Sequence, residues 1–326
     1  MKSNAPSFIV SISFCGVPAD ESMITGISGF TSRMTCSASS PPTSGITISK
    51  KTPSGFSCRS IMTASLLIIG PKAFYMCKSL ALIPGDPTSI GESAFAFSGV
   101  SEADLGGSAE VRIAKEAFWY TQVEKVVLGS ASVGESAFAD CKSLASLRIG
   151  AGSVGARAFS GCTAMRTADL GAVSSIGDRA FEDCNYLGSV GGIAADAVGE
   201  RAFSGCMALE SVSFTSSELR SLPASAFAGC TSLKKISVSP DNAVLRSDGR
   251  TVLDAAGTLL VCAPGISEVT LGENVSSVKG LGTQDVVLQY SESLKSISVS
   301  GGNQSYSSAD GDRKSTRLNS SHLAES

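Results

Sequence analysis

Apolar residues recur along the middle of the chain in a unit of about 22 residues. One part of the unit reads Leu-x-x-Ile/Val-x-Val/Leu, as at 144–149 and 233–238, and its alternation predicts a short strand with one buried face. The other part reads Val/Ile-Gly-x-x-Ala-Phe. A period between 20 and 29 residues is typical of a solenoid, in which no unit can fold alone. We therefore expect a repeat solenoid with one short parallel β-strand plus a turn or short helical segment per coil.

The phenylalanine of this unit defines eight coils, at Phe74, Phe95, Phe118, Phe138, Phe159, Phe181, Phe203 and Phe227. In each turn, glycine should let the backbone reverse sharply, and alanine should permit close approach of the next coil. The phenylalanine should then fill the centre, where burial of each ring contributes roughly 2–3 kcal/mol. Phenylalanine outnumbers tyrosine and tryptophan together, which indicates that aromatic side chains serve mainly as buried volume.

Six of the ten cysteines occupy one position of the repeat, three residues after the phenylalanine: Cys77, Cys141, Cys162, Cys184, Cys206 and Cys230. Equivalent residues of adjacent coils stack about 4.8 Å apart with parallel side chains, which leaves their Cβ atoms beyond the ~3.8 Å that a disulfide prefers. We expect a ladder of buried thiols acting as small hydrophobes, with disulfides between neighbours as the alternative. A single row of thiols does not converge on a metal ion.

Two coils, those of Phe95 and Phe118, lack this cysteine. They are also one residue shorter, because Val100 and Val123 follow the phenylalanine by five residues, where other coils place Leu or Met six residues on. The two changes occur together and predict a second, tighter form of the turn.

Residues 1–65 carry no copy of the repeat and are rich in Ser and Thr. The apolar stretch Phe8–Val17, followed by Ala19, has the outline of a secretory signal cleaved after Ala19. A disordered polar leader and a misassigned start are the alternatives.

The repeat array spans residues 66–239 and is interrupted at 240–265. Within the interruption, Asp248-Gly249 and Ala256-Gly257 are turn signals beside apolar runs, so we expect an inserted β-hairpin. Repeats resume over 266–311. A second copy of the interrupted unit begins at Ser293 and reaches Asp310-Gly311.

The second copy breaks off into residues 312–326, which resemble a translated sequencing-library adapter and contain the single histidine, His322. We expect this tail to be non-native and the natural chain to continue into more coils. An ordinary polar tail is the alternative.

The units Ile-Gly-x-x-Ala-Phe-x-x-Cys-x-x-Leu-x-x-Val-x-Leu, the shorter cysteine-free variant and the hairpin insertion together resemble the BspA-like leucine-rich repeats over residues 66–311. The resemblance implies a solenoid of the leucine-rich-repeat type. Members of that family are typically bacterial or protist surface and secreted proteins, and several are associated with adhesion to host or matrix proteins. The resemblance therefore implies a cell-surface or secreted location and a protein partner.

The remaining residues offer little chemistry. The net charge of −3 gives no footprint for nucleic acid, and no stretch of 18 apolar residues predicts a membrane span. No nucleophile elbow, phosphate-binding loop or His-Glu-x-x-His motif occurs. We assign no catalytic, cofactor-binding or metal-binding residue and expect no cofactor and no enzyme activity. Carboxylates after the turn glycine indicate one solvated edge of the solenoid: Glu92, Glu135, Asp178 and Glu200.

On the solenoid fold, one strand position per coil forms an exposed row: Asp104, Val127, Arg148, Asp169, Ser213, Ser237 and Ser298. This row is polar and without aromatic residues, which favours a protein partner over carbohydrate or nucleic acid, although a plain solvated surface fits equally. The sequence predicts a non-catalytic protein-interaction module whose binding residues and oligomeric state it does not specify. The alternatives are an accessory region of a larger enzyme and a structural spacer.

Overall fold

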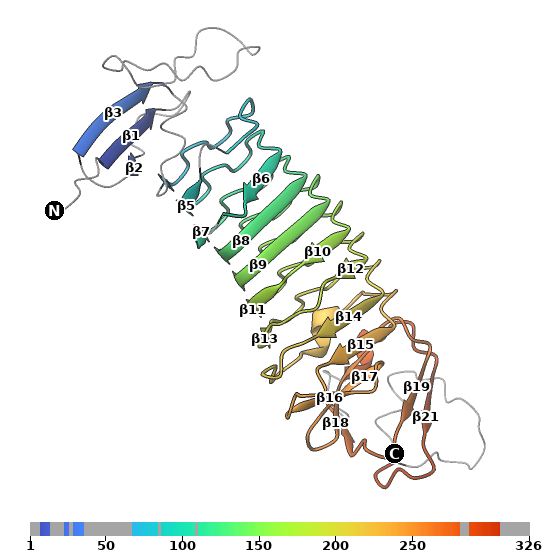
Figure 1. Cartoon of the computed structure of the whole chain (residues 1–326). Helices are drawn as coiled ribbons and strands as arrows, with labels where there is room; N and C mark the ends of the chain where they lie inside the picture. The colour runs from blue at the N-terminus through green and yellow to red at the C-terminus, as the bar shows by residue number, and fades with distance from the viewer. Residues whose placement is uncertain are drawn as a thin grey trace, which may run out of the picture.

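The computed structural model describes residues 67–83, 86–107, 110–280 and 287–306, together with three strands nearer the N-terminus. Those three strands form a separate sheet in the order β2-β1-β3: β1 (Ser7–Ser13), β2 (Met23–Thr25) and β3 (Gly29–Thr35). The run predicted as a signal overlaps β1, whereas cleavage after Ala19 and the tail at 312–326 lie outside the described residues. Beyond this sheet the chain forms an elongated stack of coils (Figure 1).

The strand that the sequence predicts builds a parallel ladder along the stack. Its inward residues are in register, because Leu147 pairs with Val126 in the preceding coil and with Ala168 in the following one. The ladder runs through β6 (Glu102–Leu105), β8 (Lys125–Val133), β9 (Ser146–Val154), β10 (Thr167–Asp169) and β12 (Ser189–Val190), and a further parallel pair follows in β14 (Ser211–Phe214) and β15 (Lys235–Val238).

Each coil in the middle of the stack also contributes to a second parallel ladder, which the sequence reading did not predict. It forms just before the turn glycine, where an apolar residue such as Val133, Val154 or Ile176 points into the core. Its members are β4 (Leu67–Ile69), β5 (Pro87–Ile90), β7 (Val111–Ile113), the C-terminal halves of β8 and β9, β11 (Ala172–Ile176) and β13 (Ala197–Val198). The coil is therefore a flattened loop with two strand edges and one turn edge.

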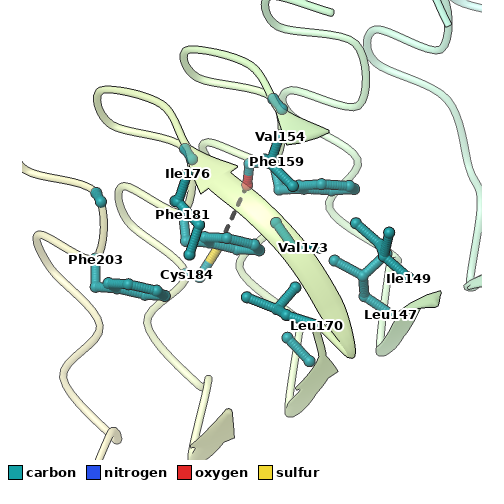
Figure 2. Packing of buried hydrophobic residues seen from close by; sticks show 14 of the residues in the cluster. Leu147, Ile149, Val154, Phe159, Leu170, Val173, Ile176, Phe181, Cys184 and Phe203 are labelled. Carbon is teal, nitrogen blue, oxygen red and sulfur yellow. Dashed lines mark hydrogen bonds between the residues drawn. The ribbon is translucent and has the colours of Figure 1, made fainter. Parts of the chain in front are cut away.

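The eight repeat phenylalanines stack into one column in the interior, as the sequence predicts. Neighbouring rings from Phe74 to Phe227 lie 4.7–5.9 Å apart between centroids, with interplanar angles of 2–10°. Figure 2 shows three of them, Phe159, Phe181 and Phe203, beside the inward residues of the two ladders. Seven of the eight are fully buried, and Phe74 at the N-terminal end is 7% exposed.

The turn glycine has a different role from the one predicted. Gly155 is not in the left-handed region; instead, a Cβ there would lie 2.7 Å from the backbone oxygen of Val133 in the preceding coil. At this position, the close approach of the preceding coil therefore favours glycine. The sharp reversal is made by left-handed residues on either side of the phenylalanine, such as Arg157 (φ 55°).

The insertion contains an antiparallel meander of three strands, β16 (Leu245–Ser247), β17 (Thr251–Asp254) and β18 (Thr258–Cys262). The two reversals fall at the predicted turn signals. The resumed repeats then add β19 (Glu268–Leu271), β20 (Ser277–Val278) and β21 (Ser296–Val299), with β18 parallel to β20 and β19 parallel to β21. The described residues contain two short 3-10 helices, η1 (Ala224–Phe227) and η2 (Val287–Tyr290), and no α-helix.

In the described part of the second copy, one asparagine repeats the contacts of its equivalent in the first. Asn242 donates to the carbonyl oxygens of Leu219 (2.8 Å) and Ser216 (3.4 Å), and its own oxygen accepts the N–H groups two and three residues on. Asn303 makes the matching four bonds, donating to the carbonyls of Gly272 and Val275. An Asn side chain, buried at 242 and half-buried at 303, thus bonds the backbone at the same place in both copies.

Candidate functional site

Beside the phenylalanine column runs a second column, three residues further along each coil. Its cysteines are free and buried, apart from the half-buried Cys77 at the N-terminal end, as predicted. Each of the five buried thiols also donates a hydrogen bond to the carbonyl of the column phenylalanine in the preceding coil; Cys184 Sγ lies 3.2 Å from Phe159 O (Figure 2). The same bond recurs at 3.0–3.2 Å from Cys141, Cys162, Cys206 and Cys230. The thiols are therefore donors that join adjacent coils, which the prediction of small hydrophobes did not include.

The two cysteine-free coils fill this column with hydroxyl residues. Thr121 Oγ1 lies 3.2 Å from Cys141 Sγ, and Ser98 takes the equivalent place in the coil of Phe95. Both side chains are buried, but Ser98 Oγ has no hydrogen-bond partner. These two shorter coils thus keep the column and replace its thiol with a hydroxyl.

Three thiols of the column are chemically quiet. Burial raises the pKa of the Cys184 and Cys230 thiols to about 12, and it raises the pKa of Cys206 well above its ordinary value. Since the thiolate is the reactive form, these cysteines stay protonated at neutral pH. Among the residues that the structure describes, no three His, Cys, Asp or Glu side chains group closely enough to hold a metal ion.

The predicted exposed row, apart from Ser298 on β21, lies along the first ladder and the β14–β15 pair, and we call it the strand face. Asp104, Val127, Arg148 and Asp169 are in register on successive strands, and Arg148 Nε lies 3.7 Å from Asp169 Oδ2. Both side chains of that pair are more than half exposed, so the contact contributes little. The carboxylates predicted to line a solvated edge, Glu92, Glu135, Asp178 and Glu200, are also exposed.

The turn edge of the stack differs along its length. Every coil places the residue two after the column phenylalanine in the left-handed region. In the five later coils this residue is Asp or Gly, which adopt that conformation readily: Asp140, Gly161, Asp183, Gly205 and Gly229. In the first three coils it is Met76 (φ 58°), Phe97 (φ 58°) and Tyr120 (φ 58°). A left-handed L-residue costs about 1–2 kcal/mol, so these coils carry large side chains there against the backbone preference.

These three residues belong to a cluster that we call the aromatic ridge: Tyr75, Met76, Phe97, Trp119 and Tyr120. Phe97 is at its centre, with ring centroids 5.8 Å from Tyr75, 4.9 Å from Trp119 and 5.5 Å from Tyr120. Met76 is 55% exposed and Tyr120 is 42% exposed. The cluster also contains Trp119, the single tryptophan of the chain. The ridge is the most aromatic part of the described surface and is our candidate functional site.

The ridge was missed at the level of sequence because we expected aromatic residues to be buried. The signal was present in the spacing: Phe97 and Tyr120 follow the column phenylalanines Phe95 and Phe118 by two residues. Once the column ring points inward, the residue two further along the turn points outward. Phe97 and Tyr120 should therefore have been assigned to the surface.

Lysines border the ridge on the side where each turn leads into the next strand. Lys78 follows Met76 by two residues and is exposed. Lys142 places its Nζ 5.4 Å from the centroid of the Tyr120 ring, a cation–π arrangement. Neither lysine forms an ion pair with any residue that the structure describes. The opposite border is neutralised in part, because Lys115 pairs with Glu135 at 3.0 Å.

Within the described part of the chain, no helix has the length and apolar character needed to cross a membrane. No curated protein matches the sequence.

Several solved structures match the chain at low identity. A leucine-rich repeat protein from Bacteroides ovatus is 16% identical, with a TM-score of 0.39; the alignment covers 72% of this chain and 65% of that one. A leucine rich cell surface protein from Faecalibacterium prausnitzii is 22% identical, with a TM-score of 0.30 and coverage of 72% and 76%. The pneumococcal vaccine antigen PcpA is 15% identical, with a TM-score of 0.31 and coverage of 72% and 51%. The chain thus spans about two thirds of the Bacteroides protein and half of PcpA.

The family model for the BspA type leucine rich repeat region matches in six copies, over residues 46–166, 111–191 and 152–248. Together these ranges cover more than half of the chain. They include all eight column phenylalanines. The chain therefore belongs to the BspA type leucine-rich repeat family.

Proposed function

We propose that the chain is a non-catalytic module that binds another protein through an exposed face of the solenoid, at the cell surface or after secretion. One observation carries this proposal. Each coil has the same fully packed interior, whereas the side chains at its exposed strand and turn positions change from coil to coil. A repeat stack of this kind offers a long surface that can vary without changing the fold.

The character of the two exposed faces supports a protein ligand. The strand face combines short polar side chains with alternating charge, and the turn edge of the first three coils adds an aromatic cluster. Tyr, Trp, Phe and Met are the residues enriched at the centres of protein interfaces. The surface location and a role in adhesion are parts of this proposal that follow from the family.

A binding screen tests the proposal. The full chain would be immobilised and exposed to a panel of extracellular and matrix proteins, with the thermally unfolded chain as the control. We expect at least one partner to bind saturably to the folded chain alone. A panel without such a partner would favour a structural spacer and contradict the proposal.

A further inference from the structure

We propose that the aromatic ridge binds an extended protein segment that carries an apolar anchor next to acidic residues. The inference rests on the proposed function, because it names the binding site and the partner chemistry of the same interaction module. It begins from the backbone. Met76, Phe97 and Tyr120 hold left-handed φ angles at a turn position where the five later coils place Asp or Gly.

Folding does not require these side chains, since the same turn forms in the later coils without them. Gly161, Gly205 and Gly229 hold φ angles of 74–76° at the equivalent position. Long side chains such as Arg157 also hold left-handed φ angles at the other turn position, so what distinguishes the first three coils is that their outward residue is large and apolar or aromatic. The exposure of Met76 and Tyr120 leaves their apolar surface available for a ligand.

The arrangement of the rings favours a protein partner over a carbohydrate. Sugars stack on open, flat ring faces, but Phe97 packs edge-on against Tyr75 (83°) and Trp119 (65°). The result is an uneven apolar surface that includes a methionine. Aromatic residues and methionine on a polar-rimmed patch are typical of the centre of a protein interface, where a partner side chain inserts as an anchor.

Two lysines on one border of the ridge indicate the charge of the partner on that side. Lys78 and Lys142 lie at the two ends of one border, and both are exposed without an ion-pair partner among the described residues. A segment lying along the ridge would place its flanking residues next to these ammonium groups. Acidic flanks therefore complement the border, and basic flanks are repelled.

The tryptophan makes the site its own reporter. Because Trp119 is the only tryptophan of the chain, a change in its emission reports on the ridge itself. The full chain would be titrated with tryptophan-free synthetic peptides on a Gly/Ser background. One peptide carries Phe and Leu anchors flanked by Glu, a second has the same anchors flanked by Lys, and a third has Glu without anchors.

We expect the first peptide to change Trp119 emission saturably, and the other two to bind at least about tenfold more weakly. Tyr120→Gly should weaken binding of the first peptide about tenfold. Because glycine suits the left-handed backbone, this variant should retain the fold. Lys142→Glu should weaken binding of the acidic peptide and strengthen binding of the basic one. Lys235→Glu is the matched control, because Lys235 is exposed on β15 away from the ridge, and it should change neither.

Three results would overturn the inference: no emission change with any peptide, equal binding of acidic and basic peptides, or acidic-peptide binding that Tyr120→Gly leaves unchanged. Neutral oligosaccharides that change Trp119 emission where peptides do not would identify a glycan site instead. The proposed function is tested separately. If a partner from the protein panel binds the Met76→Gly/Tyr120→Gly variant unchanged, the interaction module stands and the ridge is not its site.

Discussion

The first three coils and the five that follow share one interior and differ in surface. Both regions bury the column phenylalanine with its ring stacked on the next, and both fill the position three residues later with a small side chain. At the exposed turn, the first region has Met76, Phe97 and Tyr120, where the second has Asp or Gly. The comparison separates what the fold needs from what the surface adds. The fold needs the inward residues and a left-handed turn, whereas the outward side chain is free to serve binding.

The shared interior predicts equal losses in the two regions. Phe95→Ala and Phe181→Ala each remove a fully buried ring and leave a cavity, so each should lower the free energy of unfolding by about 3–5 kcal/mol. Urea unfolding of the two full-length variants provides the measurement. A loss below about 1 kcal/mol in either region would break the assignment of one continuous column.

The thiols predict a pH dependence confined to the second region. The pKa of Cys184 is about 12 in the folded chain, against an ordinary value of 9.0. The folded chain keeps the proton that the unfolded chain releases, so this stability is complete below pH 9 and falls as pH rises toward 12. Above pH 9, the free energy of unfolding of the wild type should therefore fall by about 1.4 kcal/mol per pH unit more than that of Cys184→Ser.

Urea unfolding at pH 8 and pH 10.5 under reducing conditions measures this difference. Each protein serves as its own reference at pH 8, and the other ionisable groups are common to both. Parallel pH dependences for wild type and Cys184→Ser would show that the thiol is not buried in the column.

The hydroxyl at Ser98 sharpens the comparison within the column. Its buried oxygen has no partner, whereas Thr121 contacts the thiol of Cys141. Ser98→Ala should therefore stabilise the chain by about 1 kcal/mol, because an unsatisfied buried hydroxyl is removed. Thr121→Val is the matched control, with an expected loss of about 1 kcal/mol. Thermal unfolding of both variants checks the signs, and a destabilised Ser98→Ala would contradict the assignment.

The left-handed turn predicts a modest effect in the second region. Gly229 has φ 75°, and a Cβ there would meet its nearest atoms at 3.5 Å, an ordinary contact. Gly229→Ala should therefore cost about 1 kcal/mol through the backbone alone. An unchanged free energy of unfolding would mean that this position tolerates side chains freely, and the argument from Met76 and Tyr120 would lose its force.

The sequence period predicted the fold because each repeat places the same types of residue at the same buried positions. The phenylalanine column, the buried cysteines and the antiparallel insertion at 240–265 all followed from spacing. The second ladder was missed because it rests on few apolar residues per coil, such as Val154, beside glycine-rich segments. The predicted role of Gly155 was wrong, because its contact with the preceding coil depends on the three-dimensional stacking of the coils. Sequence spacing alone does not reveal that contact.

The candidate site was harder to predict for a related reason. No helical or strand periodicity in the sequence marks a ridge residue such as Tyr120. What identifies it as a candidate site residue is its left-handed φ and its contact with the ring of a neighbouring coil. Both require the turn geometry. The strand face, by contrast, was predicted correctly in register from simple alternation.

The free energy of unfolding of the full-length Met76→Gly/Tyr120→Gly variant tests most directly whether the aromatic ridge is additional to the fold. If it is, glycine relieves two left-handed side chains, and the variant should be as stable as wild type or up to about 2 kcal/mol more stable. A loss of more than about 1 kcal/mol would mean that these side chains hold the first coils together, and it would contradict the account.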